Sequence, residues 1–197
     1  MTTPPQRDLA DYEILVGVCG GIAAYKVCDV VSKLVQRGAG VTVAMTASAR
    51  HFVGPMTFQA LTGRDVLTDV WASEKPGDVQ HIALTAAADL VLIAPATANI
   101  IGKIASGIAD DLVTTLVISA ASPVILAPAM NERMWKNPIV QENVAKLTHL
   151  GYAFVGPAEG WLACRTIGEG RMAEASDILE TVIAKAKSQS PKHAPNR

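Results

Sequence analysis

The stretch "EILVGVCGGIAAYKVCDVVSKLVQRGAGVTVAM", residues 13–45, decides the fold. It begins and ends with short aliphatic runs, residues 13–18 and 41–45. Between them, apolar residues recur near helical spacing up to Gly38, a residue type that commonly ends helices; they are Ile22, Tyr25, Val30, Leu34 and Val35. A strand, a helix and a second strand in this order predict two parallel strands joined by a right-handed crossover.

The same alternation continues along the chain. Further aliphatic runs at residues 89–95, 123–128 and 152–156 predict three more strands. Residues 137–151 predict a helix, because Asn137 can cap it, Pro138 suits its first position and Gly151 can end it. The chain therefore reads as an α/β single-domain doubly wound parallel sheet, Rossmann-like or flavodoxin-like, with helices on both faces. We expect one domain over residues 13–187, a flexible N-terminus (1–12) and a disordered tail (188–197).

The composition agrees with such a sheet and excludes several classes of protein. Half of the 197 residues are hydrophobic, only 5% are aromatic, and the mean hydropathy is +0.28, as aliphatic strands buried on both faces require. A formal net charge of −1 without a basic block argues against nucleic acid as a partner. No apolar run is long enough for a membrane span, and the start lacks signal-peptide features. The three cysteines have neither disulfide nor metal-site spacing, so we expect a cytoplasmic protein without a metal.

The distinctive sequences all follow predicted strands. They are "CGGIAAYK" (19–26), "MTASARHF" (45–52), "PATANIIGK" (95–103), "PAMNERMW" (128–135) and "LACRTIGEGRM" (162–172). Because ligands bind at the carboxyl ends of parallel strands, near a switch in strand order, these loops predict one shared site.

The first of these loops favours a single phosphate over a dinucleotide. It lacks the G-x-G-x-x-G spacing and is not a P-loop, but Gly20 and Gly21 allow close backbone approach before a helix N-terminus. Thr46, Thr97 and Asn99, together with Ser48, add hydroxyl and amide groups. The alternative for the glycine pair is a tight strand-to-helix turn.

His81 is a candidate general base. If Asp78 caps the helix that follows it, His81 falls in the first turn, where the helix dipole disfavours the imidazolium form. A capping or surface histidine is the alternative.

Four segments together resemble the FMN-dependent cysteine decarboxylase (HFCD) flavoprotein family. These are "GGIAAYK" (20–26), "APATAN" with "GKIASGIADDL" (94–112), "PAMNERMW" (128–135) and "ACRTIGEGRM" (163–172). The third matches the family pattern P-x-M-N-x-x-M-W and is the most specific of them. The resemblance covers roughly residues 13–180.

This resemblance implies an FMN enzyme that converts 4'-phosphopantothenoylcysteine to 4'-phosphopantetheine in coenzyme A biosynthesis, through thioaldehyde and enethiol intermediates. It implies His81 as catalytic base and Cys164 as the acid that completes the reaction. It implies substrate contacts from Asn131, Met134, Arg165, Gly168, Arg171 and Met172. The implied FMN contacts are Gly20, Gly21, Ile22, Thr46, Phe52, Thr97, Ala98, Asn99 and Asp111. It also implies a homotrimer or a dodecamer of trimers, with a separate ligase protein upstream in the pathway.

Some features leave alternatives open. The family has glycine where Arg165 stands, and a positive φ there would strain the arginine. Asp110 and Asp111 could cap the next helix instead of touching flavin. An oxidative peptidyl-cysteine decarboxylase, a flavin prenyltransferase and an FMN-binding regulatory subunit share the fold, although the first needs no terminal proton donor such as Cys164.

Overall fold

A computed structural model describes residues 7–70 and 80–192. Its main sheet has five parallel strands in the order β2-β1-β3-β4-β5. The strands are β1 (Glu13–Val18), β2 (Gly40–Met45), β3 (Leu90–Ala96), β4 (Val124–Pro128) and β5 (Ala153–Phe154). The chain runs from β1 to β2 on one side and then returns past β1 to β3, so the strand order switches between β1 and β3. This is the predicted doubly wound sheet, of the flavodoxin-like order.

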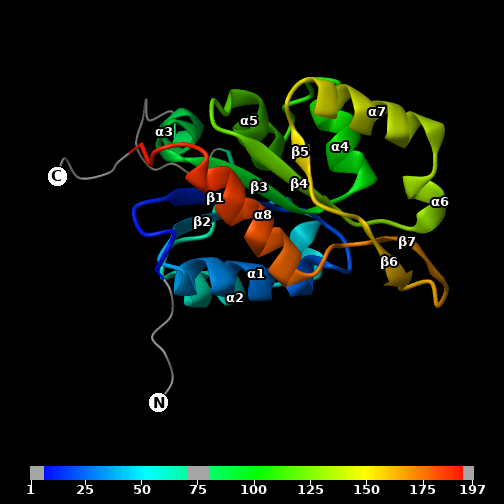
Figure 1. Cartoon of the computed structure of the whole chain (residues 1–197), viewed down its shortest axis with the longest axis horizontal. Coiled ribbons are helices and arrows are strands. Elements are labelled where there is room, and N and C mark those ends of the chain that lie inside the picture. The colour runs from blue at the N-terminus through cyan, green and yellow to red at the C-terminus, as the bar shows by residue number, and fades with distance from the viewer. Residues whose placement is uncertain (1–6, 71–79, 193–197) are drawn as a thin grey trace, which may run out of the picture.

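Helices cover both faces of the sheet (Figure 1). One layer holds α1 (Ala24–Gln36), α2 (Pro55–Thr62) and α8 (Ala175–Lys187). The other holds α3 (Gln80–Ala87), α4 (Ala98–Ala105), α5 (Leu112–Ser119) and α7 (Pro138–His149). Two short helices, η1 (Ala49–His51) and α6 (Glu132–Trp135), follow β2 and β4.

The strands are buried because each side chain meets one of the two helix layers. In β1, Ile14 and Val16 join the core under α1 and α8, whereas Leu15 joins the core under α4 and α5. Every residue of β3 is buried. The aliphatic composition thus builds two apolar cores, one on each face of a parallel sheet.

The first helix differs from the predicted pattern at its start. Val30 and Leu34 are buried as expected, but Ile22 and Tyr25 are 60% and 57% exposed. The helix begins only at Ala24, so its core stripe starts with Ala24 and Val27. Ile22 and Tyr25 face away from the core.

The segment after the fifth strand, which includes the predicted site loop 162–172, is an antiparallel hairpin. Its strands are β6 (Ala158–Trp161) and β7 (Ile167–Arg171), and β7 lies against α6 (Figure 1). Gly170 has a φ of 131°, and a Cβ there would collide with the Met130 carbonyl oxygen. Glycine at position 170 therefore allows the hairpin to pack tightly on the loop after β4.

Parts of both termini expected to be flexible are packed. Leu9 is fully buried, and Asp8 forms ion pairs with Arg37 and Lys187. Both partners, with desolvation opposing them, hold the pKa of Asp8 below its usual value. Residues 1–6 and 193–197 lie outside the described residues.

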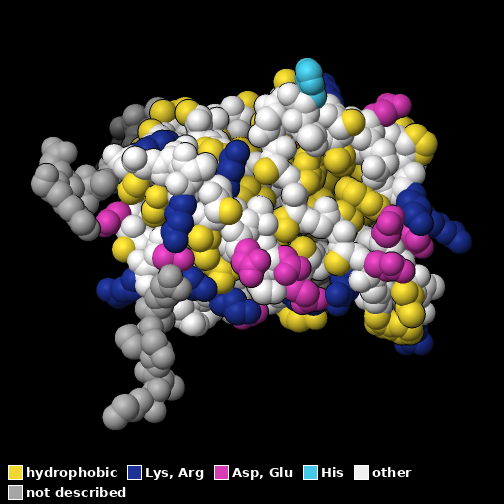
Figure 2. Space-filling model, in the orientation of Figure 1, with side chains coloured by type: hydrophobic (Ala, Val, Ile, Leu, Met, Phe, Trp, Pro, Cys, Tyr) yellow, Lys and Arg dark blue, Asp and Glu magenta, His cyan; other side chains and the backbone are white. Residues whose placement is uncertain are grey.

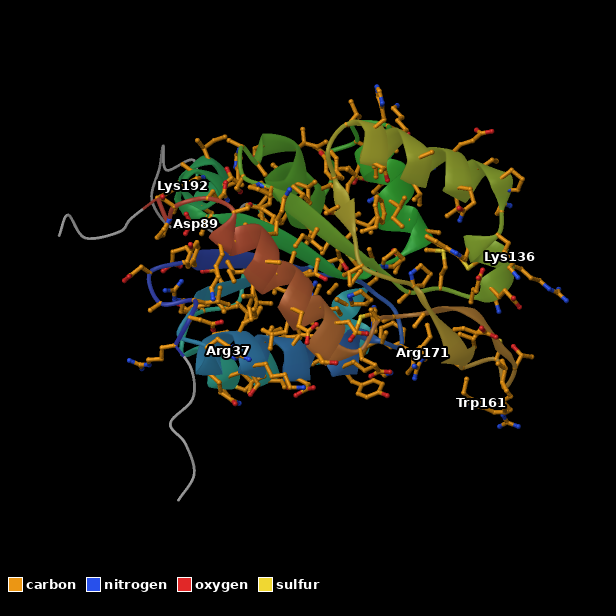
Figure 3. The ribbon with its side chains drawn as sticks, viewed as in Figure 1. Arg37, Asp89, Lys136, Trp161, Arg171 and Lys192 are labelled. Carbon is orange, nitrogen blue, oxygen red and sulfur yellow. The ribbon has the colours of Figure 1, made fainter. Side chains whose placement is uncertain are left out.

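At the amino edge of the sheet, where its strands begin, Asp89 links distant segments of the chain through hydrogen bonds. This side chain is fully buried, and it accepts hydrogen bonds from the backbone N–H groups of Glu13 (2.8 Å) and Lys192 (2.7 Å). The Asp89 carbonyl accepts another from Gln189 Nε2 at 2.7 Å. Figure 3 shows Asp89 and Lys192 together at the end of the molecule opposite Trp161.

Candidate active site

A cavity of about 1280 Å³ opens at the carboxyl edge of the sheet, where the strands end. It is large compared with ordinary small-molecule pockets of about 300–1,000 Å³. Most of the predicted site residues line it: Gly20, Gly21, Ile22, Thr46, Thr97, Ala98, Asn99, Asp111, Asn131, Met134, Cys164, Arg171 and Met172. Residues of the separate strand-end loops thus lie together around one cavity.

Two helix N-termini meet this cavity at the switch in strand order. Helix α1 follows Gly21, and its capping residue, Ala23, makes no side-chain cap. Helix α4 is capped by Thr97, whose hydroxyl accepts a hydrogen bond from Ile100 N–H at 3.3 Å. Neither helix has an acidic residue in its first turn. Because uncapped N–H groups and the helix dipole favour anions, this end of the cavity suits a phosphate.

The loop after β2 closes the side of this anion site. The Thr46 hydroxyl accepts a hydrogen bond from Ala49 N–H at 3.2 Å. A Cβ on Gly20 would collide with Ser48, so glycine is needed for the two loops to approach each other. The glycine pair therefore makes a tight strand-to-helix turn and also lines the cavity.

Asp111 lines the cavity and also caps α5. Its Oδ1 accepts from Thr114 N–H at 2.9 Å, and its Oδ2 lies 3.1 Å from Lys103 Nζ. Lys103 also pairs with Asp110 at 2.7 Å, and this contact raises the pKa of the lysine. Asp110 is exposed and does not line the cavity.

Asn131 stands at the end of β4 as the N-cap of α6. Its Oδ1 accepts from Arg133 N–H at 2.9 Å, which fixes the amide so that its N–H groups face outward from the helix. Asn131 Nδ2 donates to Cys164 Sγ at 3.3 Å. The capping bond thus orients an amide donor toward the thiol in the cavity.

Cys164 lies in the turn of the hairpin and is exposed. Its sulfur lies 3.0 Å from the Thr166 hydroxyl. The hydrogen bond with this hydroxyl, helped by the Thr166 N–H and the Asn131 amide, lowers the pKa of Cys164. Burial instead raises the pKa of Cys19, which is buried, and of Cys28, which is partly buried. Of the three cysteines, Cys164 is therefore the exposed one and the one whose pKa is lowered, the two conditions that favour thiol chemistry.

Arg171 and Met172 form the base of the hairpin. Arg171 Nε is buried without a hydrogen-bond partner, while Arg171 Nη2 pairs with Glu174 at 2.9 Å. Figure 3 shows Arg171 at the root of the hairpin and Trp161 at its outer end. Arg171 thus lines the cavity with one buried guanidinium nitrogen that has no partner within the described residues.

Four predicted site residues do not line the cavity of their own chain: His81, Phe52, Arg165 and Gly168. His81 lies in the first turn of α3, where its carbonyl accepts from the Thr85 hydroxyl; Asp78, its expected capping partner, lies outside the described residues. Phe52 ends η1 with its side chain 48% exposed. A Cβ on Gly168 would collide with the Glu132 carboxylate.

Arg165 occupies the turn with a φ of 65°. This left-handed conformation is the one that favours glycine, and it costs a residue such as arginine about 1 kcal/mol. The strain considered from the sequence is therefore present.

Several cavity residues were not identified from the sequence. They are Tyr25, Lys26, Lys103, Trp161 and Leu162. Tyr25 and Lys26 follow the glycine pair by one helical turn, a spacing that could have placed them on the cavity side of α1. Trp161 could not be assigned without knowledge of the hairpin.

Exposed apolar side chains surround the mouth of the cavity. Ile22, Tyr25, Met134 and Trp161 line it, and Ile167, 69% exposed, lies opposite Trp161 on the hairpin. Figure 2 shows apolar side chains at the lower right, over the hairpin, bordered by charged ones. Large exposed apolar groups around a cavity are typical of a surface that another molecule covers.

Two negative findings apply to residues 7–70 and 80–192. Within these ranges no cluster of His, Cys, Asp and Glu could hold a metal ion. Helices long and apolar enough to cross a bilayer are likewise absent from them.

The fold and the site together define a class. The chain is a flavodoxin-like α/β protein whose switch-point cavity brings two helix N-termini together with an amide and an exposed thiol. Comparison with known proteins identifies the class further: the chain belongs to the Flavoprotein family, whose model matches residues 2–187.

The relatives and structural neighbours are consistent with this family. The coenzyme A biosynthesis bifunctional protein CoaBC of Bacillus subtilis is 49% identical over 172 residues, covering 87% of this chain and 42% of the relative. The chain thus spans about two-fifths of the length of the curated relatives it matches.

Two solved structures resemble the chain closely. One is a PPC decarboxylase mutant complexed with pantothenoylaminoethenethiol, with a TM-score of 0.79, 33% identity, and coverage of 87% of this chain and 96% of that one. The other is the FMN-dependent cysteine decarboxylase SpaF, with a TM-score of 0.79, 38% identity, and coverage of 91% and 99%.

Proposed function

We propose that this chain catalyses the FMN-dependent decarboxylation of 4'-phosphopantothenoylcysteine to 4'-phosphopantetheine in coenzyme A biosynthesis. The observation that carries the proposal is the contact between the Asn131 amide and the Cys164 thiol on the wall of a cavity that two helix N-termini also meet. The coenzyme A biosynthesis relative and the PPC decarboxylase neighbour support this choice of reaction.

The residues of the cavity fit FMN as the cofactor. The N-termini of α1 and α4 would hold its phosphate beside Gly21, Thr97 and Ala98, and the mostly apolar lining suits a flavin ring. When bound, FMN would accept a hydride from the thiol-bearing carbon of the substrate and return it at the end of the reaction.

Asn131 and Cys164 would act on the substrate in turn. The Asn131 amide would bind the substrate carboxylate through its N–H groups. After oxidation, the thioaldehyde group is β to this carboxylate and accepts the electron pair released with carbon dioxide, giving an enethiol. The Cys164 thiol would then give its proton to the nitrogen-bearing carbon, while the hydride returns to the sulfur-bearing carbon. Arg171, and Arg165 in the turn, would meet the phosphate end of the substrate.

His81 is proposed as the catalytic base, supplied by a neighbouring copy. It does not line the cavity of its own chain, and neither does Phe52. The apolar side chains around the cavity mouth support a surface covered by a second copy. We therefore propose a homotrimer or a dodecamer of trimers, which light scattering of the purified protein would test. A cytoplasmic location and a separate ligase protein remain predictions.

The first experiment identifies the chromophore and the reaction. Purified protein should release non-covalent FMN on denaturation and should release carbon dioxide from 4'-phosphopantothenoylcysteine. The His81→Asn variant should keep FMN yet lose carbon dioxide release, whereas His149→Asn, a change on the exposed surface of α7, should behave like the wild type. FAD, or no flavin at all, would refute the cofactor; normal turnover in His81→Asn would refute the role of this histidine.

The product separates the alternatives. An oxidative peptidyl-cysteine decarboxylase would release an enethiol and leave the flavin reduced, and an FMN-binding regulatory subunit would release no carbon dioxide. A saturated thiol product supports the proposed reaction.

A further inference from the structure

We propose that Thr166 is a positioning residue that, together with Asn131, holds the Cys164 sulfur between two hydrogen-bond donors for delivery of its proton. The inference deepens the proposed function, on which it rests, because it concerns how the final proton is delivered. Thr166 belongs to none of the predicted sets of site residues.

The geometry places two polar groups on one sulfur. Asn131 Nδ2 lies 3.3 Å from Cys164 Sγ, and Thr166 Oγ1 lies 3.0 Å from it. The two groups come from different elements, the N-cap of α6 and the hairpin turn. The sulfur therefore joins the loop after β4 to the hairpin at the wall of the cavity.

Local structure holds both groups in place. Leu162 N–H donates to the Thr166 carbonyl at 2.8 Å, and Arg165 N–H donates to the Leu162 carbonyl at 2.9 Å, which closes the turn around Cys164. The left-handed Arg165 lies between Cys164 and Thr166 and lets their side chains meet. The Asn131 amide cannot rotate freely, because its Oδ1 is used in capping α6.

The direction of these hydrogen bonds follows from the chemistry of each group. The amide Nδ2 can only donate, so the sulfur accepts from Asn131. A hydroxyl can donate or accept, but once the thiol has given up its proton the thiolate can only accept, so Thr166 must then donate. Hydrogen bonds to an ionised partner are stronger than those to a neutral one. Both groups therefore favour the thiolate that proton delivery leaves behind.

In the final proton transfer the Cys164 S–H bond breaks, its proton goes to the nitrogen-bearing carbon of the enethiol, and the electron pair of the broken bond remains on Sγ. The lowered pKa of Cys164, for which the Thr166 hydroxyl is the largest cause, agrees with this geometry.

Charged groups do not replace these two donors. The surrounding elements carry Arg165 in the turn, Glu159, Glu169 and Arg171 on the hairpin strands, and Glu132 and Arg133 on α6. The hydrogen-bond partners of Sγ are Thr166 and Asn131, and no side chain of this charged set bonds to it.

The test compares Thr166→Val, which removes the hydroxyl at nearly constant shape, with Thr166→Ser, which keeps it. In the FMN-loaded protein without substrate, alkylation of Cys164 by iodoacetamide is followed against pH by mass spectrometry of the peptide. Thr166→Val should move the midpoint of the alkylation–pH profile to higher pH and slow alkylation at pH 7 by about threefold. The slowing is modest because the smaller thiolate fraction is partly offset by the higher intrinsic nucleophilicity of a thiolate with a higher pKa. Thr166→Ser should match the wild type.

A second readout follows one turnover of 4'-phosphopantothenoylcysteine without oxygen. Thr166→Val should release carbon dioxide at the wild-type rate but form the saturated product about fivefold more slowly, with transient enethiol. The proposal is overturned if Thr166→Val leaves the midpoint or the product rate unchanged, or if Thr166→Ser is as impaired as Thr166→Val. If the wild type releases no carbon dioxide, the proposed function fails. The alkylation measurement still tests the contact between Thr166 and Cys164 in that case, because an unshifted midpoint in Thr166→Val would refute it.

Discussion

The two edges of the five-stranded sheet differ in how their polar groups are used. At the amino edge, Asp89 is fully buried and its carboxylate is bonded by the N–H groups of Glu13 and Lys192. At the carboxyl edge, the N-terminus of α1 has no side-chain cap and Arg171 Nε has no partner. The first edge satisfies its polar groups within the chain, as stability requires, whereas the second leaves a helix N-terminus without a side-chain cap and one guanidinium N–H without a partner beside a cavity. We therefore call the amino edge the structural edge and the carboxyl edge the chemical edge.

The largest effect should come from the chemical edge, with Asn131→Asp. Aspartate still caps α6, so the fold should persist, but a second carboxylate would repel the carboxylate of the substrate. Affinity for 4'-phosphopantothenoylcysteine, measured by calorimetry, should fall about 100-fold or more, or about 3 kcal/mol.

Asn137→Asp is the matched control, since Asn137 caps α7 in the same way, accepting from Ile139 N–H at 3.0 Å, and does not line the cavity. Unchanged affinity in Asn131→Asp would mean that this asparagine serves structure alone.

A smaller effect, on stability, should come from the structural edge. Asp89→Ala leaves two backbone N–H groups without their partner, so the free energy of unfolding in urea should fall by about 2 kcal/mol. Flavin content and Cys164 alkylation should stay as in the wild type.

The control is Asp29→Ala, which removes an exposed ion pair with Lys33 and should cost no more than about 0.5 kcal/mol. Loss of flavin in an otherwise folded Asp89→Ala protein would show that the two edges are coupled.

The smallest effect should come from Thr97, which both caps α4 and lines the cavity. Thr97→Ala removes the cap of α4 and should lower the free energy of unfolding by about 1 kcal/mol. It should also weaken FMN binding, because the α4 N-terminus faces the anion site. Thr97→Ser should restore both properties; stability lost without any change in flavin affinity would remove Thr97 from the cofactor site.

The sequence predicted what depends on local pattern and on the geometry of parallel strands. Residues 13–45 carry the strand–helix–strand pattern, and because strand ends meet at one edge, Gly21, Thr97, Asn131 and Cys164 could be expected to share a cavity. The structure brings them together there.

The sequence could not predict what depends on contacts between distant segments. The tight packing of Gly170 could not be predicted because its neighbour, the Met130 carbonyl, is 40 residues away along the chain. The tie between Asp89 and Lys192 is likewise long-range. His81, which pattern alone placed in the site, does not line the cavity of its own chain, because the fold sets α3 apart from the loops that form it.

The most direct test of the central claim, that the carboxyl edge carries out a complete decarboxylation ended by a protein thiol, is the product of Cys164→Ser. The FMN-loaded variant and the wild type are each mixed with 4'-phosphopantothenoylcysteine without oxygen, the flavin absorbance is followed, and the product is identified by mass. The wild type should give 4'-phosphopantetheine with oxidised flavin. The variant should release carbon dioxide but stop at the enethiol with reduced flavin, because a serine hydroxyl is a far weaker acid than a thiol. A saturated product from Cys164→Ser would contradict the account.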